Sequence, residues 1–254
     1  MLTIQQVKQT IRKYYEHVSL GAFIDGESKE IINVEAQRVS ASLIKPFIFY
    51  YILKRGWDLD DKIPLVEINI TEDSILRFFT GSTVTLRGLI SLMIDASDNA
   101  VSNYFLDRIG IDELNDFLRK EGFSGTLFER KFLDFQARNR GRENHTTVTD
   151  LRYLYHGVLS GKSLDQDCQR IFVSVMKNQF DRSKFALYFP DIIESGGKSG
   201  VLDNVWNDLI FFNIEGRTVL IIAMTENIPH VIARDLLPSY SYHFGMENFP
   251  HIFI

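Results

Sequence analysis

The segment VSASLIKPFIFYYILKRG, residues 39–56, places Ser42 three residues before Lys45 and then continues as nearly unbroken apolar sequence. Serine is a weak nucleophile at neutral pH unless a neighbouring base accepts its proton. On a helix, residues three apart share one face about 5 to 6 Å apart, so these two side chains can meet. Apolar burial lowers a lysine pKa and favours the neutral amine, which can act as a base. The segment therefore predicts a nucleophilic serine with a lysine base.

Ser-x-x-Lys alone is a weak signal, because this chain also has the pairs Ser174/Lys177 and Ser195/Lys198. An exposed serine on a helix face beside a solvated lysine produces the same pattern. Two motifs further along favour the first pair, namely Ser-Asp-Asn at 97–99 and Lys-Ser-Gly at 198–200. We therefore take the pair at 42 and 45 as the candidate catalytic one.

This ordered set resembles that of class A β-lactamases and penicillin-binding proteins, a Ser-x-x-Lys followed by Ser-Asp-Asn and Lys-Thr-Gly. The segment TVTLRGLISLMIDASDNAVSNYFLDRIG resembles the family's helix pair around Ser-Asp-Asn, NHTTV the end of its omega loop, and NDLIFF its next strand. The likeness runs from about Tyr14 to the last predicted helix. It implies an α/β (α+β) fold of β-lactamase/transpeptidase type, with an antiparallel five-stranded sheet flanked by helices and an inserted all-α lobe.

The resemblance also implies roles for the motif residues. Ser42 would be acylated, Lys45 would be its base or proton relay, and Ser97 would pass a proton to the departing nitrogen. Asn99 would bind the substrate's side-chain amide and the Lys45 amine. Lys198 would attract a substrate carboxylate and help to keep Lys45 deprotonated.

The remaining substrate contacts are implied by the strand that carries Lys-Ser-Gly. Ser199 keeps the hydroxyl of the family's threonine and could bind the same carboxylate, and Gly200 completes the motif. The oxyanion hole would consist of the backbone N–H groups of Ser42 and Val201, which do not depend on residue type. We expect Asp98 to be structural.

The pattern departs from the family where class A enzymes carry the glutamate that activates the deacylating water. In TLFERKFLDFQARNRGRENHTT, Phe132 stands two residues after Arg130, and no glutamate is followed four residues later by asparagine. Asp134 and Glu129 are the remaining candidate bases. The alternative for each is a salt bridge with Arg130 or Arg138. The sequence thus predicts acylation with slow deacylation.

Periodicity predicts the elements that position these residues. We expect a first helix and a hairpin, a buried helix that ends at Gly56, mostly helical sequence from Leu59 to about Tyr188, three antiparallel strands after Gly196 and a closing helix at 229–242. Candidate N-caps are Thr85, Asp112 and Thr149. Strands from both ends would share one sheet, giving an α/β lobe of about residues 1–56 and 191–254 and an α lobe of about residues 57–190.

Composition limits the classes of partner and cofactor. The 254 residues are 45% hydrophobic with a formal net charge of −5 and no basic run, so we expect no nucleic acid partner. One cysteine, Cys168, excludes an internal disulfide, and six histidines without an HExxH spacing predict no metal. We also expect no cofactor and a monomer, and the resemblance to class A β-lactamases implies a small-molecule β-lactam or peptide-like substrate.

The sequence has no apolar run typical of a signal peptide or transmembrane helix. As written it predicts a cytoplasmic protein, whereas an export signal preceding this sequence would make it a secreted one.

Several other functions stay open at this point. The protein could hydrolyse a different ester, amide or peptide with the same fold, act as a non-hydrolytic penicillin-binding protein, or be a binding module without turnover. A Ser-His-Asp hydrolase is disfavoured because Gly-x-Ser-x-Gly is absent and neither His145 nor His156 has an assigned partner. Cys168 fits helix packing better than nucleophilic chemistry.

Overall fold

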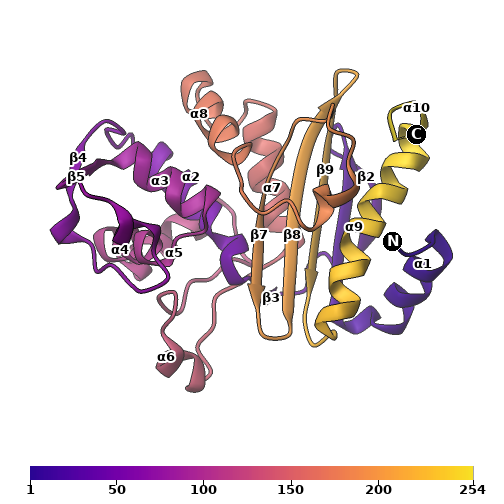
Figure 1. Ribbon diagram of the computed structural model, residues 1–254, viewed down its shortest axis with the longest axis horizontal. Coiled ribbons are helices and arrows are strands. Elements are labelled where there is room, and N and C mark those ends of the chain that lie inside the picture. The colour runs from indigo at the N-terminus through magenta and orange to yellow at the C-terminus, as the bar shows by residue number, and fades with distance from the viewer. Residues whose placement is uncertain (254) are drawn as a thin grey trace.

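A five-stranded antiparallel sheet forms the centre of the protein in this computed structural model, which describes residues 1–253 (Figure 1). Its strand order is β2-β1-β9-β8-β7, so the first hairpin pairs with the last strand of the chain. The predicted sheet, shared by both ends of the chain, is confirmed. The strands are β1 Val18–Ile24, β2 Glu27–Ile32, β7 Ser195–Leu202, β8 Val205–Ile214 and β9 Arg217–Thr225.

Two tight turns set the hairpin registers. Asp25 and Gly26 join β1 to β2, and Glu215 and Gly216 join β8 to β9, all four with positive φ between 52° and 80°. Two-residue turns with positive φ at both positions match the right-handed twist of the paired strands. The short connection at 215–216 aligns β8 with β9, and β7, which pairs with β8 alone, lies at the sheet edge.

Both faces of the sheet are covered by helices. In β9 the side chains of Leu220 and Ile222 enter one apolar core, and those of Val219 and Ile221 enter the other. A strand buried on both faces reads as a continuous apolar run, which explains TVLIIAM. Helices α1 Ile4–Lys13 and α9 His230–Asn248 lie on one face, and α7 Val148–Leu159 and α8 Gln166–Met176 on the other (Figure 1).

Helix α2, Lys45–Lys54, lies at the centre of the larger core and contacts α3, α4, α5 and α8. Its residues from Lys45 to Leu53 are buried, and the chain leaves the helix through Gly56 at φ 62°, as predicted. The remaining helices and strands are α3 Leu86–Asp95, α4 Asn99–Ile109, α5 Ile111–Lys120, α6 Phe135–Asn139, α10 Pro250–Phe253, β3 Arg38–Val39, β4 Lys62–Pro64, β5 Thr83–Thr85 and β6 His145–Thr146.

Of the predicted N-caps, only Thr85 is confirmed, since its side chain accepts a hydrogen bond from the backbone N of Gly88. The prediction of Asp112 is wrong because α5 begins directly after Gly110, whose φ of 87° turns the chain. The prediction of Thr149 is wrong because Thr147 caps α7. The closing helix also runs beyond residue 242, to Asn248.

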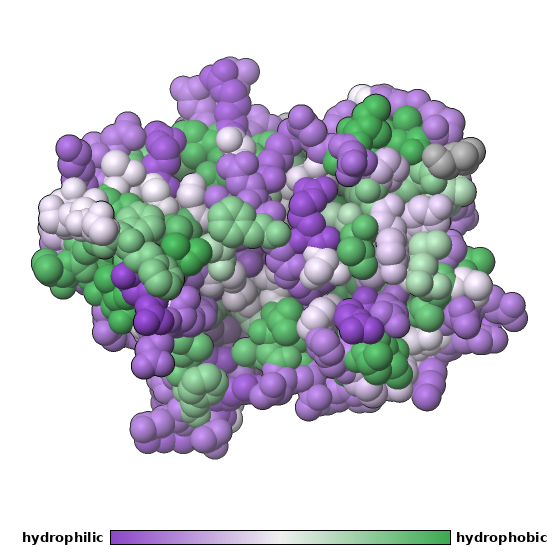
Figure 2. All heavy atoms as spheres, in the orientation of Figure 1, coloured by the Kyte–Doolittle hydropathy of each residue, from purple (hydrophilic) through white to green (hydrophobic). Residues whose placement is uncertain are grey.

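The α/β fold class is confirmed, whereas the division into two lobes stays a prediction. None of the helices within residues 1–253 is both long enough and apolar enough to cross a membrane. The space-filling view shows the face of Figure 1 hollowed between the helices at the left and the sheet (Figure 2).

Candidate active site

Ser42 lies in a 3-10 turn, Ala41–Ile44, that leads into α2. Ala41 takes φ 47°, in the left-handed region that a residue with a Cβ rarely adopts, and strain of this kind is often found at functional sites. Strand β7 approaches this turn closely. A Cβ added at Gly200 would lie 2.9 Å from the Ser42 backbone N and 2.7 Å from that of Leu43, so only glycine fits.

Lys45, the first residue of α2, is fully buried and its amine joins the Ser-Asp-Asn segment. Nζ donates to the Ser97 backbone oxygen at 2.6 Å and to Asn99 Oδ1 at 2.9 Å, and it lies 3.3 Å from Ser97 Oγ. Burial, followed by the nearby positive charge of Lys198, holds the pKa of Lys45 well below its ordinary value. A neutral amine has two N–H donors, so its lone pair is left free to accept a proton.

The Ser-Asp-Asn residues connect α3 to α4. Ser97 is held at φ 59°, which turns its backbone oxygen and its hydroxyl toward Lys45. Asp98 caps α4 through the backbone N of Val101 at 3.1 Å, and its other carboxylate oxygen accepts from Ser74 Oγ at 2.8 Å. These contacts fit the structural role expected for Asp98.

Lys198 on β7 reaches the same hydroxyl from the opposite side. Its Nζ donates to Ser97 Oγ at 3.1 Å and to the Ser199 backbone oxygen at 2.9 Å. Burial lowers the pKa of Lys198 to about 8. Ser97 Oγ therefore lies between the amines of Lys45 and Lys198, and three motifs far apart in the sequence meet at one hydroxyl.

A cleft of about 450 Å³ joins these groups to solvent, and its lining includes most of the predicted site residues: Ser42, Ser97, Asn99, Lys198, Ser199 and Val201. Val201 is 43% exposed on the edge strand β7. An edge strand leaves N–H groups unpaired on its outer side. This geometry is compatible with the expected oxyanion hole, whose assignment stays a prediction.

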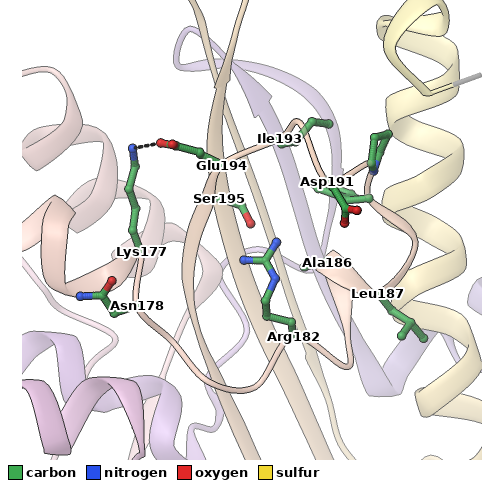
Figure 3. A pocket seen from close by; sticks show the side chains of 11 residues that line it. Lys177, Asn178, Arg182, Ala186, Leu187, Asp191, Ile193, Glu194 and Ser195 are labelled. Carbon is green, nitrogen blue, oxygen red and sulfur yellow. Dashed lines mark hydrogen bonds and ion pairs between the residues drawn. The ribbon is translucent and has the colours of Figure 1, made fainter.

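The other two Ser-x-x-Lys pairs do not form sites of this kind. Ser174 and Lys177 are exposed, and Lys177 pairs with Glu194 at 3.0 Å. Ser195 and Lys198 are three residues apart on a strand, where such side chains point to opposite faces. Ser195 lines a different cavity of 710 Å³ between segment 177–195 and β7, which holds none of the predicted site residues (Figure 3).

Comparison with known proteins identifies the family to which the chain belongs. A profile described as the beta-lactamase enzyme family matches residues 3–236. The chain belongs to this family.

Solved structures agree with the membership of this β-lactamase family protein. It is similar to a β-lactamase from Sphaerobacter thermophilus, with a TM-score of 0.81 and 22% identity over 97% of this chain and 98% of that one. It is also similar to a class A β-lactamase from Mycobacterium abscessus, with a TM-score of 0.80 and 17% identity over 95% of this chain and 98% of that one. A third similar structure is that of PBP-A, with a TM-score of 0.74 and 19% identity over 94% of each chain. At such identities the likeness shows the fold. A comparison with curated proteins found no match.

Membership in the β-lactamase family supports a hydrolase, but the two candidate deacylation bases have other contacts. Asp134 is exposed and caps α6 through the backbone N of Ala137 at 2.9 Å. Glu129 accepts from the backbone N of Glu143 at 3.2 Å and lies 3.8 Å from His145 Nδ1. Within residues 1–253, neither carboxylate forms a hydrogen bond or an ion pair with Ser42 or Lys45.

The predicted alternative, a salt bridge from Asp134 or Glu129 to Arg130 or Arg138, is wrong, because both arginines bind Glu143. Arg130 Nη2 lies 2.6 Å from Glu143 Oε1, and Arg138 Nε lies 3.3 Å from Glu143 Oε2. In this β-lactamase family member the side chain beside Lys45 is Phe132, whose ring centroid is 4.6 Å from Lys45 Nζ. An aromatic ring there can neither hold nor deprotonate a water.

Two further residues of the cleft, Asp73 and Asp181, gave no signal in the sequence. Asp73 Oδ2 accepts from Asn99 Nδ2 at 2.8 Å. Asp181 Oδ2 accepts from Ser199 Oγ at 3.1 Å, and it also pairs with the buried Lys184. These contacts join segments brought together only by the fold, and no motif marks them.

Proposed function

We propose that this protein is a serine acyl-transfer hydrolase of class A β-lactamase type, which opens β-lactams or related amides through an acyl-enzyme on Ser42 and releases it slowly. The observation that carries the proposal is the Ser97 hydroxyl held between the buried amines of Lys45 and Lys198, in the cleft that Ser42 lines. Two buried lysines with lowered pKa values that converge on one hydroxyl in a cleft are typical of a proton-transfer site.

The acylation step follows from these positions. The neutral amine of Lys45 takes the Ser42 proton while Oγ forms a bond to the substrate carbonyl carbon. The carbonyl oxygen becomes an oxyanion that backbone N–H groups stabilise. As the C–N bond breaks, Ser97 gives its proton to the departing nitrogen and regains one from the Lys45 ammonium. The proton of Ser42 thus ends on the leaving group, and Lys45 returns to its neutral form.

Deacylation has no comparable support in the cleft. A water must be positioned and deprotonated next to the ester, and the side chain against Lys45 is the Phe132 ring. This contact favours an acyl-enzyme that persists, so the second candidate is a penicillin-binding protein without efficient hydrolysis. A hydrolase of the same fold that acts on a more easily released ester, amide or peptide is the other alternative.

The test is intact mass after incubation with benzylpenicillin, followed over time, with Ser42→Ala as the control. We expect the wild type alone to gain the mass of the intact drug and to keep it after the free drug is removed. An adduct that decays while the drug is consumed would indicate an efficient β-lactamase. No adduct and no consumption would contradict β-lactam recognition and leave the esters and amides as substrates.

The pH dependence of acylation provides a further prediction. The Lys198 pKa of about 8 means that its ammonium is lost as the pH rises through that value. Because this cation holds the Ser97 hydroxyl and helps to keep Lys45 neutral, the acylation rate should fall on the alkaline side near pH 8. The acylation rate is measured between pH 6 and pH 10 by quenching the reaction at set times and determining the fraction of acyl-enzyme by intact mass. A rate that still rises at pH 10 would contradict a role for charged Lys198.

A further inference from the structure

The carboxylate of Asp181 lies in the part of the cleft where Ser199 would meet a substrate. Ser199 Oγ donates to Asp181 Oδ2 at 3.1 Å, and both residues line the cleft with Lys198. Asp181 belongs to the segment between α8 and β7, which folds back over the strand that carries Lys-Ser-Gly. The hydroxyl is therefore already engaged by an anion of the protein itself.

A buried cation fixes this carboxylate. The Lys184 ammonium, on a side chain only 2% exposed, pairs with Asp181 Oδ2 and lies 4.9 Å from the centroid of the Trp206 ring. Although burial alone would raise the pKa of Asp181, hydrogen bonds from Lys184 and Ser183 hold it well below its ordinary value. Asp181 is thus ionised at neutral pH, and the positive charge of Lys184 is neutralised before any ligand arrives.

Lys198 is the cationic side chain among the described lining residues, and its Nζ already donates to the Ser97 hydroxyl and to the Ser199 backbone oxygen. The Asp73 carboxylate also lines the cleft, so together with Asp181 it offsets this positive charge. Like charges placed together in a partly desolvated site repel strongly. A ligand carboxylate that enters beside Ser199 must displace Asp181 or lie against it.

Building on the proposed function, we infer that Asp181 is a specificity-determining residue that fills the anion-binding subsite and selects acyl donors carrying an uncharged or cationic hydrogen-bond donor there. An amide or an ammonium group can donate to the Asp181 carboxylate, whereas a carboxylate cannot. The preferred substrates are therefore esters, amides or lactams without a negative charge next to the scissile bond.

Benzylpenicillin and its methyl ester test this inference, because they differ at one carboxylate and share the ring that acylates. Second-order rate constants of acyl-enzyme formation are measured by intact mass for the wild type, Asp181→Asn and the control Asp191→Asn. Asp191 is an exposed acid of the same segment that lies outside the catalytic cleft. The ester-to-acid ratio is the rate constant for the methyl ester divided by that for benzylpenicillin. Comparing this ratio between variants cancels the difference in intrinsic reactivity of the two compounds.

We expect the ester-to-acid ratio to fall about tenfold in Asp181→Asn, mainly because the acid reacts faster without the opposing charge. Asp191→Asn should keep the wild-type ratio. Equal ratios in the wild type and Asp181→Asn, each with clear adducts, would overturn the inference and leave the proposed function intact. Absence of any Ser42 adduct with both compounds would overturn the proposed function and the inference with it.

Asp181→Asn leaves the buried Lys184 unpaired, and if the variant does not fold for this reason, the wild type alone still tests the inference. Its ester-to-acid ratio is then divided by the ratio of the two compounds' rates of alkaline hydrolysis. A corrected preference for the ester of about tenfold supports the inference, and a corrected preference for the acid overturns it.

Discussion

Lys45→Met should lower the rate of acyl-enzyme formation by about 10³-fold, because it removes the buried amine that lies three residues after Ser42 and contacts the Ser97 hydroxyl. Methionine has a similar length and no proton to exchange, so the apolar packing of α2 is kept. The substitution leaves the Ser97 backbone oxygen and Asn99 Oδ1 without their donor. We expect a loss of about 1–3 kcal/mol in unfolding free energy, to be checked by thermal melting.

Lys177→Met is the matched control for this experiment. It makes the same substitution in another Ser-x-x-Lys sequence, one that lies at the surface where Lys177 pairs with Glu194. Acylation by benzylpenicillin should be unchanged in this variant. If Lys45→Met acylates as fast as Lys177→Met while both are folded, Lys45 is not the base and the proposed step fails.

Phe132→Glu should raise the deacylation rate by about 10²-fold, the range expected for a well-placed general base. The aromatic ring lies 4.6 Å from Lys45 Nζ, so a carboxylate in its place can hold a water next to the ester. The loss of the adduct is followed by intact mass after free drug is removed. Acylation is measured separately, because a new carboxylate beside Lys45 raises its pKa and opposes its action as a base.

Phe132→Leu distinguishes the effect of a new general base from the effect of extra room for water beside Lys45. Leucine opens room for water beside Lys45 without supplying a proton acceptor. We expect its acyl-enzyme to persist like that of the wild type. Equal acceleration in both variants would mean that the ring excludes water and that the base is another group of the protein.

The local features of the fold were predictable because they depend on neighbours in the sequence. The apolar run after Ser42 predicted the buried helix that ends before Gly56, and the periodicity of the apolar residues predicted the first hairpin and the three strands after Gly196. N-caps were predicted less well. At Asp112 the preceding Gly110 sets the helix start, and at Thr149 a threonine two residues earlier caps the helix.

The sequence by itself determined the family-type motifs and their order, which predicted the fold class and named Ser42, Lys45, Ser97 and Lys198 as partners. Their catalytic roles stay proposals. Only the tertiary structure decided which side chains surround them. The Phe132 ring packs against Lys45, Glu143 pairs with Arg130 and Arg138, and Asp181 accepts a hydrogen bond from Ser199. Motif residues are recognised by type and spacing, whereas these contacts depend on how distant segments pack and where each side chain then has room to point.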